Sequence, residues 1–475
     1  MDIAIINSIL ITFENQNLGI ISNGGLGITE DKISFVGPMK HFDFSKADTV
    51  LDGRGMLTMP GLINVHFHSA HTLLRGGAQD LPEIEWMNKG IAPLIKHVKE
   101  ADRILGSKVG VLEGIQTGTT TFAEYTTDVK KLVEEVYQPL GVRVVATESI
   151  NEVSSNRSKL EPTDLYEFNK SKGEKGIKKA NELFKEFENS DLVSCMYGPQ
   201  ALDMISLDLL TTVQELAEEK QSQIHMHVAQ GNRERLQIKA RYGKDASTVS
   251  VLKKINYLNE NLIAAHIHDT TVPERKLMVK HQVKMASCQS SIAMIDGIVP
   301  PLHHYTSIGG TAGLGTDQAP GPGNHNMFRE MRSASIFGKI QNKDPTILPA
   351  WKVLEFATIG GAKVLGLDKT IGSLKIGKRA DIITINLQQL NMTPWVSKPF
   401  HNFIPNLVYS SNGTEVNDVI INGKIIYRDN EFASFDLFKL IDSANRHARR
   451  IFESGEKDWR KAGSKLVEKV DEGWL

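Results

Sequence analysis

Eight short apolar or β-branched segments recur through the middle of the chain, and charged stretches with a helical pattern, such as 205–220 and 272–282, separate several of them. The segments are 62–68, 119–125, 142–149, 192–198, 223–229, 262–268, 283–288 and 311–316. Strands that alternate with helices form a parallel sheet, and eight strands close a (β/α)8 barrel. The sequence therefore predicts an α/β fold with a TIM-type barrel. An open doubly wound sheet is the alternative, but no Gly-x-Gly-x-x-Gly fingerprint follows the first segment.

The two flanks of this region predict a second module. Residues 1–57 and 371–435 both contain short alternating strands and turns, and neither has enough strands for a stable sheet alone. We expect them to pair into one small β-sandwich domain beside a barrel that spans residues 58–370. The tail, residues 436–475, reads as a charged amphipathic helix that packs against the body or against a partner subunit.

The composition excludes several classes of function. The 475 residues include 55 basic and 56 acidic side chains, so no electrostatic footprint for nucleic acid or anionic lipid is present. Cys195 and Cys288 are the only cysteines and neither lies in a Cys-x-x-Cys pattern, which favours a reducing compartment. The first residues lack the features of a signal peptide, and no apolar run approaches a membrane span of about 18 residues. We therefore expect a cytoplasmic protein.

Histidines gather at the carboxyl ends of the predicted strands. His66 and His68 lie two residues apart at the end of the first strand, so their side chains share one face. Later strand ends carry His225, His227, His266, His268 and Asp317. A barrel brings these distant ends together at the mouth where such enzymes place their chemistry.

Each His-x-His pair has two interpretations. A single pair is more often a hydrogen-bonded pair in the core than a metal site. Three pairs and an aspartate at the same ends of regularly spaced strands favour a metal site instead. Imidazoles with a carboxylate suit zinc, and iron(II) or manganese as alternatives.

Several longer stretches carry a family resemblance. They are PGLINVHFH (60–68), LLRGG (73–77), IEWM (84–87), IHMHVA (224–229), AAHIH (264–268), GIVP (297–300), LGTDQA (314–319) and GSLKIGKRADIITI (372–385). In this order, over nearly the whole chain, the sequence resembles the amidohydrolase superfamily. Within it, the chain is similar to the metal-dependent aminohydrolases of nucleobases, nucleosides and s-triazines.

The resemblance implies a site for one metal ion per chain, with zinc expected and Fe²⁺ or Mn²⁺ as alternatives. His66, His68, His227 and Asp317 match the ligands of the family. His266 matches the histidine that orients the attacking water or the substrate. No lysine lies at the end of the fourth strand, 195–200, so the carboxylated lysine of binuclear relatives has no counterpart there. Family membership also implies a homodimer or a larger homo-oligomer.

The implied reaction is hydrolysis of a small heterocyclic substrate. A divalent ion lowers the pKa of water toward 7, Asp317 accepts the proton of that water, and His266 stabilises the developing charge. We expect removal of an amino group from a nitrogen heterocycle. Hydrolysis of a cyclic amide or of a chloro-substituted heterocycle is the alternative, and a non-catalytic metal-binding relative is the third interpretation.

One position departs from the family pattern. Many deaminases of this branch carry Glu three residues after the fifth-strand histidine, where this chain has Gln230. An amide forms hydrogen bonds but does not relay a proton at neutral pH. Three interpretations of Gln230 are open. In the first, Gln230 positions the substrate while Asp317 and His266 transfer the protons. In the second, the leaving group needs less assistance from an acid, and in the third, the protein has weak or lost catalytic activity. Glu234 replaces the missing carboxylate only if its loop curls back; a solvated charge at a helix start is the expectation.

Other candidates for substrate contact come from the same comparison with the family. They are Gln200, Gln230, His71, Glu85, Trp86, His303 and Asn324. Nucleoside deaminases tend to have His at the position of Gln200 and Glu at that of Ile95, so the pattern favours triazine-like and other small heterocycles. Four of these residues have a simpler alternative role. His71 has a capping or surface role, Trp86 packs in the interior, His303 is a solvated loop residue, and Asn324 orients the loop that carries Asp317.

Overall fold

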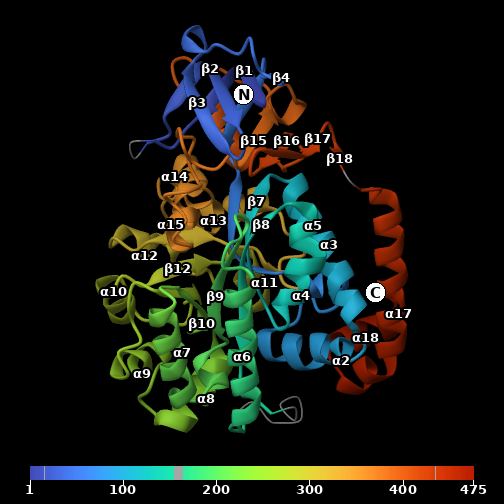
Figure 1. The fold of residues 1–475 in the computed structure, drawn as a ribbon. Helices are drawn as coiled ribbons and strands as arrows, with labels where there is room; N and C mark the ends of the chain where they lie inside the picture. Colours follow the sequence, from blue (N-terminus) through green and yellow to red (C-terminus); the bar gives the residue numbers. More distant parts are fainter. Residues whose placement is uncertain (15–16, 155–163, 434) are drawn as a thin grey trace.

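The computed structural model describes residues 1–14, 17–154, 164–433 and 435–475. A parallel sheet surrounded by helices carries a mixed sheet at one end, and a long helix near the C-terminus lies along one side (Figure 1). The predicted combination of a TIM-type barrel and a module built from both chain ends is confirmed.

The barrel strands form in chain order, and every observed pairing between them is parallel. They are β6 (Leu62–His68), β7 (Thr119–Thr126), β8 (Arg143–Ile150), β9 (Val193–Pro199), β10 (Ile224–Val228), β11 (Leu262–His266), β12 (Lys284–Ser287), β13 (Ala312–Leu314) and β14 (Asp317–Gln318). All eight predicted segments contain a strand. The last one, 311–316, contains β13, and the short strand β14 follows directly after it as the second part of the eighth barrel strand.

The split strand closes the barrel. Its first part, β13, pairs with β12, and its second part, β14, pairs with the first barrel strand β6. Gly315, between the two parts, lies so close to β6 that a Cβ there would be 2.8 Å from the His66 backbone nitrogen. A larger residue would push the eighth strand away from the first.

The helices cover the outside of the barrel (Figure 1). The longer ones are α3 (Glu100–Gln116), α6 (Lys170–Glu186), α7 (Leu207–Glu219), α8 (Asn232–Tyr242), α10 (Val272–Lys280), α13 (Met327–Asn342) and α17 (Leu437–Ala462). Short ones are α2 (Ala92–Ile95), α9 (Thr248–Lys254), α11 (Gln289–Ile295), α12 (Leu302–Ser307), α14 (Ala350–Phe356), α15 (Ile359–Val364) and α18 (Lys465–Asp471). Local sequence fixes several starts: Ser206 caps α7, and Thr271 with Glu274 forms a capping box at α10.

Small and branched side chains from six barrel strands fill the space beneath the polar strand ends. They form one buried cluster that includes Ile63, Val65, Ala123, Val145, Met196, Ile263, Ala265 and Ala286. Layers of this kind make the inside of such a barrel a packed core rather than a pore. The histidines at the strand ends therefore lie next to a tightly packed apolar layer.

Both chain ends contribute to the second sheet, which is mixed and branches at β1. Its strands are β1 (Ile3–Ile11), β2 (Ile20–Thr29), β3 (Lys32–Pro38), β4 (Thr49–Asp52), β5 (Met56–Pro60), β15 (Ile382–Asn386), β16 (Val416–Ile421), β17 (Lys424–Arg428) and β18 (Glu431–Phe432). The two flanks join where β5 pairs antiparallel with β15. The β1 strand pairs with β4 through its first half and with β5 through its second.

The predicted tail helix is α17, and it packs against the barrel as expected. Ile451 is fully buried, in the same apolar cluster as Leu94 of α2. Arg450 donates to the buried carboxylate of Asp102, and His447 Nδ1 lies 2.7 Å from Asp102 Oδ1. Among the described residues, no helix is both long and apolar enough to span a membrane.

Asp102→Ala is expected to loosen α17. The change leaves Arg450 and His447 without their shared acceptor and removes the acceptor for the Lys99 N–H at the start of α3. The free energy of unfolding in urea should fall by roughly 1–3 kcal/mol. Asp458→Ala, which removes a more exposed partner of His97, should lower the free energy of unfolding by less than Asp102→Ala does. Equal losses in the two variants would contradict a specific role for Asp102.

Candidate active site

Barrel closure brings two histidines and one carboxylate together. His68 Nε2 lies 3.1 Å from His66 Nε2. Asp317 Oδ1 lies 3.7 Å from His66 Nε2 and 3.3 Å from His68 Nε2. Asp317 reaches them because β14 pairs with β6, where it lies opposite Phe67. Residues separated by 249 positions in the chain thus share one site (317 − 68 = 249).

Histidines from β10 and β11 complete the group. The His66 ring lies 4.9 Å from the His227 ring and 5.1 Å from the His266 ring, measured between centroids. One nitrogen from each of these three rings lies within 4.8 Å of the others. Of the predicted strand-end residues, His66, His68, His227, His266 and Asp317 are therefore brought together.

Hydrogen bonds behind the rings fix their tautomers. His68 Nδ1 donates to the Tyr125 carbonyl oxygen, and His227 Nδ1 donates to the Gln200 carbonyl oxygen at 2.8 Å. Each bond leaves the lone pair on Nε2 free to face the centre of the site. His66 Nδ1 lies 2.9 Å from His225 Nε2. Metal-binding histidines are oriented by such contacts on the far ring nitrogen.

Burial keeps the imidazoles neutral. It lowers the pKa of His68 to about 4 and those of His66 and His227 well below the usual value. Neutral imidazole is the form that ligates metal. Burial also raises the pKa of Asp317 to about 6, an effect that the hydrogen bond from Ser291 opposes. Neutral imidazole nitrogens and one carboxylate at this spacing fit a divalent ion such as zinc.

The backbone turns sharply at three strand ends. Ala229 after β10, His266 and Ile267 at the end of β11, and Asp317 have φ values of 50°, 76°, 47° and 60°. This left-handed region is costly for residues other than glycine, above all for a β-branched one. The Ile267 N–H donates to the Val228 carbonyl oxygen at 3.0 Å, so the neighbouring strand holds the strained turn. Strained residues of this kind cluster at functional sites.

Several supporting residues were missed from sequence. Ser291 Oγ donates to Asp317 Oδ2 at 2.6 Å, which leaves Oδ1 to face His66 and His68. Asn64 Nδ2 donates to Thr316 Oγ1 at 2.8 Å, and the Thr316 N–H donates to Asn64 Oδ1 at 3.1 Å. These partners are far apart in the chain, so no local pattern signals them.

A cavity of about 450 Å³ opens beside His68 on the side of β7 and β8. Its lining includes His68, His71, Ile95, Val98, Arg103, Tyr125, Ser149, Asn151 and Gln200. Gln200 Oε1 accepts a hydrogen bond from Asn151 Nδ2 at 2.6 Å, so the two amides form one polar wall. Two of the predicted substrate contacts, His71 and Gln200, thus line this space.

The other five predicted contacts, Gln230 among them, do not line that cavity in the described part of the chain. Trp86 is buried, and its Nε1 donates to the Pro320 carbonyl oxygen at 3.2 Å. Asn324 Oδ1 accepts from the Asn326 N–H at 3.0 Å within the loop after Asp317. Glu85, before Trp86, and His303, on α12, are both half-buried. Trp86 and Asn324 hold loops of the mouth, while the roles of Glu85 and His303 in substrate binding stay predictions.

Gln230 lies at the mouth, and its loop does curl back onto Glu234. The Gln230 N–H donates to Glu234 Oε2 at 2.8 Å, and the Ala229 N–H donates to Glu234 Oε1 at 3.3 Å. Glu234 is fully buried, and burial raises its pKa to about 7. The expectation of a solvated charge at a helix start is therefore wrong. Glu234 anchors this loop because its carboxylate accepts the hydrogen bonds of the Ala229 and Gln230 N–H groups.

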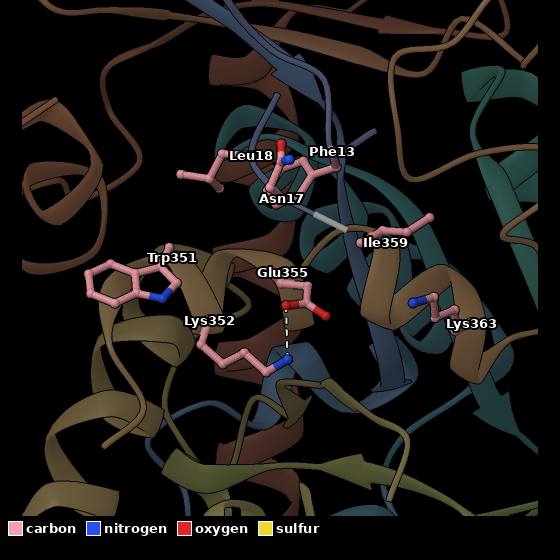
Figure 2. Close-up of a pocket in the computed structure, with 8 residues that line it drawn as sticks. All are labelled: Phe13, Asn17, Leu18, Trp351, Lys352, Glu355, Ile359 and Lys363. Carbon is pink, nitrogen blue, oxygen red and sulfur yellow. Dashed lines mark hydrogen bonds and ion pairs between the residues drawn. The ribbon is translucent and has the colours of Figure 1, made fainter. Parts of the chain in front are cut away.

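A second cavity has a volume of about 360 Å³, and Figure 2 shows the residues that line it. Phe13, Leu18 and Asn17 line it from the β-sheet domain, and α14 and α15 form its other wall. Its charged contact is an ion pair between Lys352 Nζ and Glu355 Oε2 at 2.9 Å. No histidine lines this space among the described residues, so it lacks the ligand set of the barrel mouth.

Comparisons with known proteins agree with this geometry. A family model described as "Amidohydrolase family" matches residues 57–426. A 5-methylthioadenosine/S-adenosylhomocysteine deaminase from Desulforudis audaxviator is 32% identical over 435 residues, which cover 91% of this chain and 95% of the relative. A 5′-deoxyadenosine deaminase from Methanosarcina acetivorans is 31% identical over 455 residues, covering 95% and 98%.

A solved structure matches the whole architecture. The crystal structure of an adenosine deaminase from Xanthomonas campestris, with bound zinc, superposes with a TM-score of 0.85 at 25% sequence identity. The match covers 95% of this chain and 98% of that one. The barrel and the sheet built from both chain ends are therefore shared with that structure.

Glu234→Ala is expected to destabilise the loop that carries Gln230. The change leaves the Ala229 and Gln230 N–H groups without their acceptor in a buried position. A buried donor without a partner costs about 1–3 kcal/mol, so the free energy of unfolding should fall by roughly 2–4 kcal/mol. Glu219→Ala, at an exposed position of α7, should change it by less than about 0.5 kcal/mol. A loss no larger than that of the control would show that Glu234 does not anchor the loop.

Proposed function

The chain belongs to the amidohydrolase family, and we propose that it hydrolytically deaminates an adenine-containing nucleoside whose 5′ carbon carries no free hydroxyl group. The observation that carries this proposal is the convergence of His66, His68, His227, His266 and Asp317 at the barrel mouth. The predicted family and the predicted class of enzyme, a hydrolase that acts on C–N bonds, are confirmed.

The relatives change the preferred substrate. Gln200 and Ile95 alone favoured triazine-like heterocycles, whereas the curated relatives above are named for nucleoside substrates. The cavity of about 450 Å³ has the size of a small-ligand site. Asn151 and Gln200 provide hydrogen bonds on one wall, and Ile95 with Val98 adds an apolar surface. An apolar surface suits a 5′-deoxy or methylthio substituent better than a charged one.

One zinc ion per chain is the proposed cofactor, held by His66, His68, His227 and Asp317. The neutral rings, their fixed tautomers and the nearby carboxylate support this set. Zinc supplies hydroxide at neutral pH, because it lowers the pKa of water toward 7. The far-side contact of His66 with His225 supports the orientation of this ligand.

The protein's own groups then move the protons. Asp317 takes one proton from the attacking water and passes it to the ring nitrogen next to the attacked carbon. His266 orients the water and stabilises the charge that develops on its oxygen. The Gln230 amide forms hydrogen bonds with the base but carries no proton. Water and the amine thus give a ring carbonyl and ammonia.

Hydrolysis of a cyclic amide or of a chloro-substituted heterocycle is the second candidate. Gln230 favours it, since such leaving groups need less help from an acid than ammonia does. Release of ammonia separates the two candidates directly.

The zinc-loaded protein is expected to release ammonia from 5′-deoxyadenosine and 5′-methylthioadenosine, with a larger kcat/KM than from aminotriazines. His66→Ala and Asp317→Asn should lower kcat/KM by roughly 100-fold to 10,000-fold, because each removes a group that acts in the chemical step. His41→Ala, at an exposed position, is the matched control. Ammonia release from none of these substrates, with metal bound and the fold intact, would contradict deamination.

Elemental analysis after zinc loading and dialysis should find about one ion per chain. His66→Ala should lose most of it, and His225→Ala should weaken zinc affinity by roughly 10-fold to 100-fold through the orientation of His66. His41→Ala should retain the ion. A His225→Ala variant that binds zinc as tightly as the unmodified protein would rule out this orienting role.

A further inference from the structure

Three polar side chains at the barrel mouth point at one place beside Gly231. A Cβ on Gly231 would lie 3.2 Å from His268 Nε2, 3.3 Å from Glu83 Oε2 and 3.4 Å from Asp296 Oδ1. They come from separate segments: Glu83 precedes Trp86, His268 follows β11, and Asp296 ends α11. Gly231 itself has a φ of 118° and directly follows Gln230.

His268 presents a ring nitrogen without a hydrogen-bond partner, Nε2, to this place. Its side chain is fully buried, yet neither ring nitrogen has a hydrogen-bond partner among the described residues. Nε2 lies 3.5 Å from Asp296 Oδ2. Burial lowers the pKa of His268 to about 4, so the ring is neutral and one nitrogen is an acceptor. A buried polar group without a partner is costly and calls for a ligand that provides one.

The charge around this place is negative. Arg233 donates to Glu83 Oε1 at 3.1 Å and also to the buried carboxylate of Asp203, so its single positive charge is shared by two acids. Asp296 adds a third acid when it is ionised. The side chains of Glu83 and Asp296 keep 11% and 10% of their surface exposed, which connects them to solvent at the mouth.

We propose that Glu83, Asp296 and His268 form an amine-binding subsite, which receives the leaving group of the deamination. The proposal rests on the proposed function for the identity of that amine. An ammonium or alkylammonium group offers several N–H donors and one positive charge, which match two carboxylates and one neutral imidazole. The subsite adjoins the reaction centre, since the His268 ring lies 6.3 Å from the His266 ring.

Asp296 also has the chemistry to protonate that amine. Burial and the neighbouring Glu83 raise the pKa of Asp296 to about 7. As the C–N bond breaks, its electron pair stays on nitrogen, the nitrogen takes the carboxyl proton of Asp296, and ammonia forms. The hydroxyl proton of the tetrahedral adduct passes to Asp317, which releases it to solvent, and Asp296 regains a proton from solvent. Asp296 thus acts as the acid that the amide of Gln230 does not provide.

Calorimetric titration with methylammonium chloride tests the subsite on the zinc-loaded protein, without turnover. Tetramethylammonium chloride is the control, because it carries the same charge without an N–H group. Methylammonium is expected to bind at least about 10-fold more tightly than tetramethylammonium, since only it donates to the three acceptors. Equal affinity for the two cations would overturn the proposal.

Two variants assign the binding to these residues. Asp296→Asn and Glu83→Gln should each weaken methylammonium binding by about 10-fold or more, because each removes a charged acceptor. Glu219→Gln is the control, because that carboxylate is exposed on α7 and is not among the groups that influence Asp296. Either of the two variants suffices if the other fails to fold. Unchanged affinity in a folded variant of either kind would overturn the proposal.

Binding should also depend on pH. Methylammonium should bind roughly 10-fold more tightly at pH 8 than at pH 6, because Asp296 ionises across this range. The charged groups that influence Asp296 are Glu83, Arg233, Asp269 and Asp317. Methylammonium binding without nucleoside deamination would leave the subsite standing and reject the proposed function. If the protein deaminates nucleosides but Asp296→Asn binds methylammonium as tightly as the unmodified protein, the proposed function stands and the subsite is rejected.

Discussion

The site depends on one pairing, that of the short strand β14 with β6, which closes the barrel. It sets Asp317 beside His66 and His68, although 249 positions separate Asp317 from His68. Asn64 and Thr316 reinforce the closure with two reciprocal hydrogen bonds. Gly315 permits it, since no larger residue fits against the His66 backbone. Without closure, the ligands of one ion would lie on opposite edges of an open sheet.

This arrangement has two energetic costs, a strained backbone and the burial of polar groups. His266, Ile267 and Asp317 adopt left-handed φ values that side chains disfavour. Burial in a dry pocket also opposes the charged form of each imidazole and of the carboxylate. A cation at the centre would relieve the second cost, because it gives the nitrogen lone pairs and the carboxylate a partner. The arrangement of the site is thus favourable for binding a cation and unfavourable for the stability of the protein without one.

The sequence predicted the architecture well, for physical reasons. Parallel strands are buried on both faces, so they read as short apolar runs such as 142–149, and all eight runs contain a strand. The two flanks were recognised as parts of one β domain, because neither had enough strands alone; the structure joins them in one mixed sheet rather than the predicted sandwich. The histidines were found since the His-x-His spacing puts both rings on one face of a strand.

What the sequence did not predict depends on contacts between distant segments. Ser291 reaches Asp317 only because α11 begins at the barrel mouth. Glu234 was misread as a solvated charge, since burial of a helix start by a curled loop leaves no local signal. Glu83, Asp296 and His268 converge from three separate segments, and no spacing rule links them. The substrate preference inferred from Gln200 and Ile95 differs from that of the relatives, because two positions do not describe the cavity around them.

Anomalous X-ray diffraction at the zinc absorption edge, on crystals of the zinc-loaded protein, tests the central claim most directly. The account predicts a single anomalous peak per chain, between His66, His68 and His227 and next to Asp317 Oδ1. A peak elsewhere in the molecule, or none at this position in zinc-loaded crystals, would contradict it. The claim that barrel closure assembles a metal centre would then fail, whatever activity the protein shows.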